Sequence, residues 1–91
     1  MSMKKEAVDL QLHMTVKTIA ILQEEINCNL EEIMKKVKFL QEKKEEGEEA
    51  DHLLEMISDN LNKLNELFEQ RKNLRNQIEN LKKIQNDLMR Q

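Results

Sequence analysis

The sequence predicts an all-α fold, an antiparallel two-helix coiled-coil hairpin that turns near Gly47 and associates into a helical bundle. Three observations lead to this prediction. The 91 residues contain no proline and a single glycine, so nearly every position suits a helix. Apolar residues recur at alternating spacings of four and three, which is typical of a coiled coil. The pattern is interrupted once, around Gly47.

The first predicted helix covers about residues 5–44. Its periodic residues would form one side of a seam between the two helices, and only Gln23 among them is polar. The remaining members are Leu12, Val16, Ile19, Ile26, Leu30, Ile33, Val37 and Leu40.

The predicted turn covers about residues 45–50, within a segment, 41–49, that has no apolar side chain. Gly47 costs about 1 kcal/mol relative to alanine inside a helix, which favours a break there. The second predicted helix covers about residues 51–90 as part of the same single domain, 1–91. Its seam residues are Leu54, Ile57, Leu61, Leu64, Phe68, Leu74, Ile78 and Leu81.

Folding the two helices back on each other aligns these two sets of residues. Residues whose numbers add to 94, such as Leu40 and Leu54, then share a layer. The same rule places Gln23 opposite Arg71, a polar layer that would fix register and orientation. The alternative is one long helix in an extended coiled coil, in which the acidic segment 45–69 would lie against its own copy.

Further apolar residues lie outside this seam and predict a second interaction face. Exposed apolar surface of that extent marks a binding site for other helices. The residues of this face are Leu10, Met14, Ile21, Leu22, Met34, Phe39, Leu53, Met56, Leu67 and Leu88.

Charge and composition argue against nucleic acid and membrane-spanning functions. The net charge is -3 and tryptophan and tyrosine are absent, which disfavours phosphate contacts and base stacking. No apolar run approaches the roughly 20 residues that span a bilayer. Lys35, Lys36 and Lys38 give a weaker expectation of peripheral contact with anionic surfaces.

The residue types that carry catalysis are scattered. The single cysteine, Cys28, has no neighbouring base in the sequence, and one cysteine fits a reducing location, cytoplasmic or nuclear. His13 and His52 lie far apart, and the lone Glu49-x-x-His52 lacks the second copy that a di-iron bundle requires. We therefore expect no enzyme, no cofactor and no metal.

The functional expectation is a structural or adaptor subunit that assembles proteins. Its partners would be itself, as a homodimer or higher oligomer, or other coiled-coil chains. The alternative is a regulatory module that binds an amphipathic helix of a signalling or transcription protein.

Overall fold

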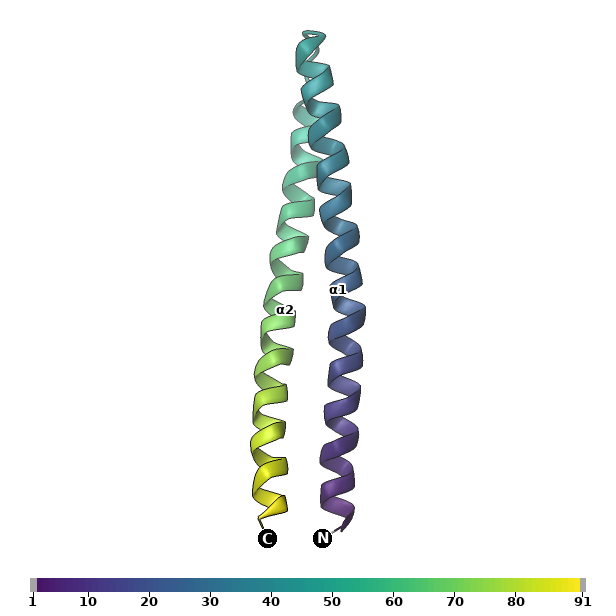
Figure 1. Cartoon of the computed structure of the whole chain (residues 1–91). Helices are drawn as coiled ribbons and strands as arrows, with labels where there is room; N and C mark the ends of the chain where they lie inside the picture. Colours follow the sequence, from purple (N-terminus) through teal and green to yellow (C-terminus); the bar gives the residue numbers. More distant parts are fainter. Residues whose placement is uncertain (1, 91) are drawn as a thin grey trace. The chain divides into compact units, whose positions relative to one another are not determined.

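The computed structural model describes residues 2–90, which form two helices joined by a turn (Figure 1). Helix α1 covers Ser2–Glu45 and helix α2 covers Asp51–Met89. The predicted all-α helical hairpin is confirmed. One unbroken helix, the alternative prediction, is excluded because the chain reverses direction between the two helices.

Helix α1 ends in a Schellman motif, in which a residue of left-handed conformation closes the last turn. Gly47 has φ of 77°, and its amide donates to the carbonyl of Lys44 at 3.0 Å. The amide of Glu48 donates to the carbonyl of Lys43, also at 3.0 Å. Glycine adopts this conformation readily because it has no Cβ, so the sequence break predicted at Gly47 is the physical end of the helix.

Helix α2 begins with a weak cap. The carbonyl of Ala50 accepts the first helical hydrogen bond, from the amide of Leu54 at 3.0 Å. The methyl side chain of Ala50 cannot accept a bond from a free amide as serine or asparagine would. Asp51 follows in the first turn, where its negative charge interacts favourably with the positive end of the helix dipole.

The hairpin consists of two compact units, each of which contains part of both helices. The turn unit is Glu24–Phe68. The terminal unit combines Met1–Gln23 with Glu69–Gln91. In each unit the two helices pack side by side in opposite directions.

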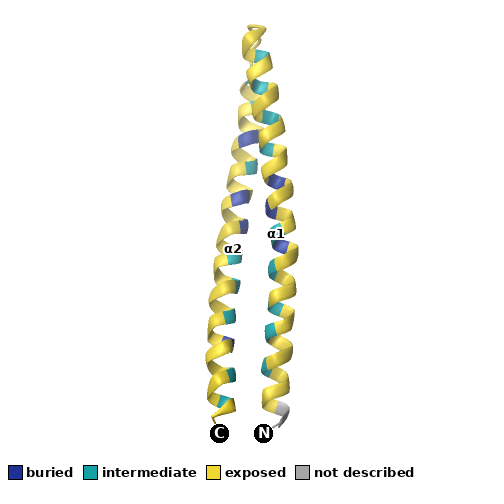
Figure 2. Ribbon diagram, in the orientation of Figure 1, coloured by how far each residue is buried: buried dark blue, intermediate teal, exposed yellow. Residues whose placement is uncertain are grey.

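The buried and half-buried positions of the turn unit repeat every seven residues in each helix, and each position of α1 has a counterpart in α2 whose number adds to 93 with its own, as for Ile26 and Leu67. We call these positions the seam of this unit (Figure 2). They are Ile26, Asn29, Ile33, Lys36, Leu40 and Lys43 in α1, and Ala50, Leu53, Ile57, Asn60, Leu64 and Leu67 in α2.

The seam of the terminal unit follows the same rule. Leu22 and Leu81 are buried at 6% and 8% exposure, and the other members are half-buried. These other members are Val8, Leu12, Thr15 and Ile19 in α1, and Arg71, Leu74, Ile78, Gln85 and Leu88 in α2.

The observed seam shares ten residues with the predicted one, all of them buried or half-buried: Leu12, Ile19, Ile26, Ile33, Leu40, Ile57, Leu64, Leu74, Ile78 and Leu81. Six other predicted members flank the seam and are 37% to 51% exposed: Val16, Leu30, Val37, Leu54, Leu61 and Phe68. In each case the preceding residue occupies the seam instead. Some of these residues are polar, and hydrogen bonds across the seam allow them to occupy it.

Candidate interaction surface

The turn unit carries a row of exposed apolar side chains beside its seam. We define the apolar stripe as Leu30, Met34 and Val37 of α1 with Leu54, Leu61 and Phe68 of α2. Their exposed fractions are 38%, 71%, 38%, 47%, 46% and 37% in that order. Large exposed apolar patches on a protein mark interaction sites, which makes this group of side chains a candidate.

The members of the stripe from the two helices lie on the same flank of the hairpin. Phe39 and Met56, which each precede a seam residue, line one shared pocket and so occupy one flank together. The stripe residues Leu30, Val37, Leu54, Leu61 and Phe68 each follow a seam residue. They therefore occupy the opposite flank, since the seam separates the two sides of each helix.

The apolar stripe contains no charge, although the turn unit as a whole is strongly charged. The neighbouring positions on the same flank are Asn27 and Gln41 in α1 and Ser58 and Asn65 in α2, which are uncharged, and Lys44 and Asp51 beside the turn, which are charged. Away from the turn, a second apolar surface can therefore approach the stripe without removing water from a charged group, which would cost several kcal/mol.

Three polar residues of the seam, Asn29, Lys36 and Asn60, form with the exposed Glu32 beside the seam a group that we call the polar cluster. The Asn29 side chain is 8% exposed. Its amide donates to the backbone carbonyl of Asn60 at 2.9 Å, and its carbonyl oxygen accepts from the Asn60 amide at 2.8 Å. Lys36 donates to the Asn60 side-chain oxygen, and the Asn60 amide also reaches Glu32 at 3.2 Å. A buried cluster of this kind fixes how two helices align.

Sequence reasoning missed this polar cluster. Asn29 and Asn60 each lie one residue before a leucine, and the hydrophobic pattern places the leucine in the seam. The spacing of seven between Asn29 and Lys36 is the signal that could have revealed a polar seam row.

In the terminal unit the structure brings together the two members of the predicted polar layer. The guanidinium of Arg71 donates to the side-chain oxygen of Gln23 at 2.6 Å. Closer to the chain ends, the Gln85 amide donates to the Asp9 carboxylate at 2.8 Å. Each unit thus has its own polar link between α1 and α2.

The residues of the predicted second interaction face do not form one surface. Leu22 and Leu67 are buried and Leu53 and Leu88 are half-buried, all within the seam. The exposed remainder divides among several sides. Met34 belongs to the apolar stripe, Phe39 and Met56 line the pocket on the opposite flank, and Leu10, Met14 and Ile21 lie on the outward side of α1.

The three lysines expected at an anionic surface are divided by the fold. Lys36 is half-buried and bonded to Asn60, whereas Lys35 and Lys38 are exposed. Only the latter two can contact a charged surface without breaking the polar cluster.

Lys43 closes the turn by contacts with three side chains. Its ammonium lies 2.9 Å from the Glu48 carboxylate, 3.7 Å from that of Glu46 and 5.2 Å from the centre of the Phe39 ring. The hydrogen bond with Glu48 is the main cause that raises the pKa of Lys43 above its ordinary 10.5. The ion pair joins the two residues whose backbones also bond in the Schellman motif.

Residues of potential chemical use do not gather. Cys28 is an exposed free thiol. Among residues 2–90, no group of three His, Cys, Asp or Glu side chains is placed to hold a metal ion. Within the same range no helix has the length and apolar character needed to cross a membrane.

The fold places this chain in the broad class of helical hairpins. Comparison with protein-family models, curated proteins and solved structures finds no match for this chain.

Proposed function

We propose that this chain is a non-enzymatic coiled-coil subunit that assembles proteins by packing further helices against its apolar stripe. The supporting observation is that Leu30, Met34, Val37, Leu54, Leu61 and Phe68 are 37% to 71% exposed on a flank whose neighbouring positions away from the turn are uncharged. A third and a fourth helix on such a flank would complete a four-helix bundle, in which the stripe becomes core.

The composition of the hairpin's own seam supports the same proposal. Asn29, Lys36 and Asn60 occupy the seam, while the leucine or valine that follows each of them remains outside. A hairpin that only had to fold by itself would gain stability from the reverse choice, since burying a leucine contributes about 1.5–3 kcal/mol. We infer that the apolar residues serve contacts with another helical chain or another copy.

A second candidate function is a regulatory module that binds a single amphipathic helix. The observation in its favour is the pocket on the opposite flank, lined by Phe39, Leu53 and Met56 with Glu49 and His52 at its edge. An apolar side chain of a target helix fits such a lining. We propose a cytoplasmic or nuclear location for either function, because a single exposed thiol suits a reducing compartment.

Two methionine variants on opposite flanks distinguish these functions. Met34→Glu puts a charge on the apolar stripe, and Met56→Glu puts the same charge in the pocket. We expect light scattering to give a mass above the 10.9 kDa of one chain for the wild type and Met56→Glu, and a lower mass for Met34→Glu. Helicity by circular dichroism verifies that both variants fold. A wild-type mass that Met34→Glu leaves unchanged at every concentration would overturn the proposal.

A further inference from the structure

We propose that a second copy of this chain covers the apolar stripe, with the turn unit of each copy packed against the terminal unit of the other. This inference rests on the proposed function and specifies both the partner and its orientation. It follows from surface area, from the charges of the two units and from the residues on one flank.

The solvent-accessible surface of the single hairpin is larger than that of a compact globular monomer of the same mass. The chain exposes 7364 Å², whereas a compact monomer of its 10.9 kDa would expose about 5,600 Å². The difference, about 1,800 Å², is more than the roughly 800 Å² that each partner buries in a typical stable interface. One hairpin therefore has enough surplus surface to form a dimer.

The two units have opposite charge. The turn unit has six Lys or Arg against thirteen Asp or Glu, a net charge of -7. The terminal unit has nine Lys or Arg against five Asp or Glu, a net charge of +4. Pairing like units would set -7 against -7, whereas pairing unlike units sets -7 against +4 twice. Charge complementarity of this kind selects orientation more than it adds affinity.

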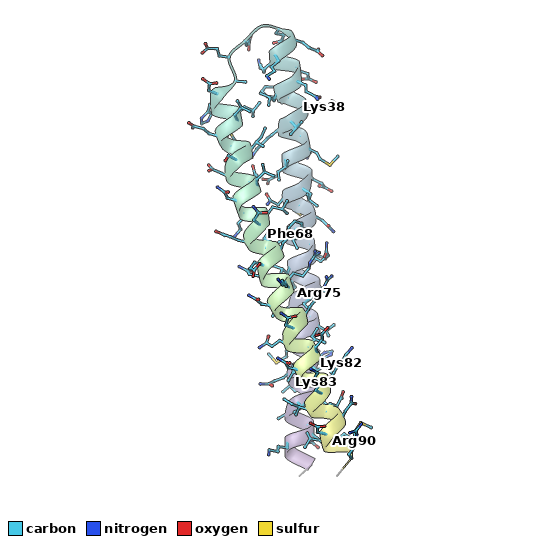
Figure 3. All side chains as sticks on the ribbon, turned by 90° about the vertical axis from the view of Figure 1, so that its left-hand side faces the viewer. Lys38, Phe68, Arg75, Lys82, Lys83 and Arg90 are labelled. Atoms are coloured by element: carbon cyan, nitrogen blue, oxygen red, sulfur yellow. The ribbon has the colours of Figure 1, made fainter. Side chains whose placement is uncertain are left out.

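One flank of the terminal unit carries residues that could meet the apolar stripe of another copy. Thr18, Gln70 and Gln77 line a pocket on the other flank, so residues that follow the seam lie on this one. There α1 presents Val16, which is 51% exposed, and Asp9, while α2 presents the exposed cations Arg75 and Lys82 (Figure 3) beside Lys72 and Glu79.

The turn unit offers partners for Val16, Arg75 and Lys82. Its apolar stripe can bury Val16 of the other copy. Glu31 and Glu55, exposed in the outermost rows beside the stripe, supply carboxylates for Arg75 and Lys82. Two copies related by a two-fold axis make this contact twice, which closes the assembly at a dimer.

Cross-linking tests the orientation of the copies. In a Cys28→Ser background, one copy carries Ser58→Cys in the turn unit and the other carries Asn86→Cys in the terminal unit, with tags of different length. A bismaleimide should join the mixed pair several-fold more than either like pair. A predominance of like pairs would overturn this inference, while the assembly function would stand if Met34→Glu still lowers the mass.

Two double variants with equal charge change test the basic side chains. Arg75→Glu with Lys82→Glu alters the proposed contact, whereas Lys83→Glu with Arg90→Glu alters the outermost row of the same helix and the residue just beyond its end (Figure 3). We expect the first pair to raise the dimer dissociation constant about tenfold or more over the second, as measured by sedimentation. Equal effects of the two pairs, or a wild type that stays monomeric at roughly millimolar concentration, would overturn the inference.

Discussion

Gly47 reverses the chain through a left-handed backbone conformation, with φ of 77°. A Cβ added at this position would meet no atom within 4 Å, so a substitution there would act only through the backbone. The effect of replacing Gly47 therefore isolates the conformational cost of the turn.

We expect Gly47→Ala to lower the free energy of unfolding by about 1–2 kcal/mol, the cost of placing an L-residue in this region. Asparagine tolerates the region better, so Gly47→Asn should fall between alanine and the wild type. Urea unfolding measures both, at one protein concentration. Equal stability of Gly47→Ala and the wild type would show that the turn does not depend on this conformation.

Asn29 and Asn60 differ in what they leave behind when replaced. The oxygen of the buried Asn29 side chain accepts a bond from Asn60, so Asn60→Leu leaves a buried acceptor without that donor. Asn29→Leu instead removes the buried amide itself, and the Asn60 side chain keeps its bonds to Lys36 and Glu32.

We therefore predict that Asn60→Leu destabilises the hairpin by roughly 1–3 kcal/mol, while Asn29→Leu is close to neutral or stabilising. The double variant should be closer to Asn29→Leu than to Asn60→Leu, because it no longer leaves the buried Asn29 amide without its partner. Urea unfolding of the three variants provides the comparison. Additive losses in the double variant would contradict this account of the polar cluster.

At the scale of the helices, the end of α1 combines backbone bonds with an ion pair. Lys43 and Lys44 lie in its last turn, where their positive charges interact favourably with the negative end of the helix dipole. Glu48 then holds the ammonium of Lys43 in place at 2.9 Å.

This ion pair makes a small contribution to stability that depends on pH. The folded pKa of Lys43 is raised, so the contribution is complete below the ordinary 10.5 and is lost as pH rises through the folded pKa. We expect the difference in melting temperature between the wild type and Glu48→Gln to be constant near neutral pH and to shrink above 10.5. A difference that persists at higher pH would assign the effect of Glu48 to something other than the charge of Lys43.

The sequence was sufficient to predict both helices, the turn and one of the polar contacts between the helices, Gln23 with Arg71. Spacing predicted the break at Gly47 and the meeting of Gln23 with Arg71. It did not predict which of two adjacent rows enters the seam, because Asn29 and Leu30 both keep the spacing of seven. Hydrophobicity favours the leucine, whereas the structure stabilises the asparagine by bonds to Asn60 that depend on the partner helix.

At the scale of the whole molecule, the charges of the two units predict how salt affects assembly. Screening shortens the reach of charge from about 10 Å at 0.1 M salt to about 3 Å at 1 M. The attraction between a turn unit of -7 and a terminal unit of +4 should weaken accordingly. We predict that the dimer dissociation constant rises with sodium chloride concentration, as measured by sedimentation. If like units faced each other, salt would screen their repulsion and the dissociation constant would fall instead.

The Schellman turn also implies an order of folding. Lys43 and Ala50 face each other across the shortest loop in the chain, and every further layer of the seam encloses a longer one. Closing a loop costs more entropy as it lengthens, by about 0.6 kcal/mol for each doubling, but once a layer has formed the next one needs only a few more residues to be ordered. We therefore expect the layers of the hairpin to form in order from the turn towards the chain ends. The layers nearest the chain ends, which form last, should be the first to exchange their amide hydrogens with solvent.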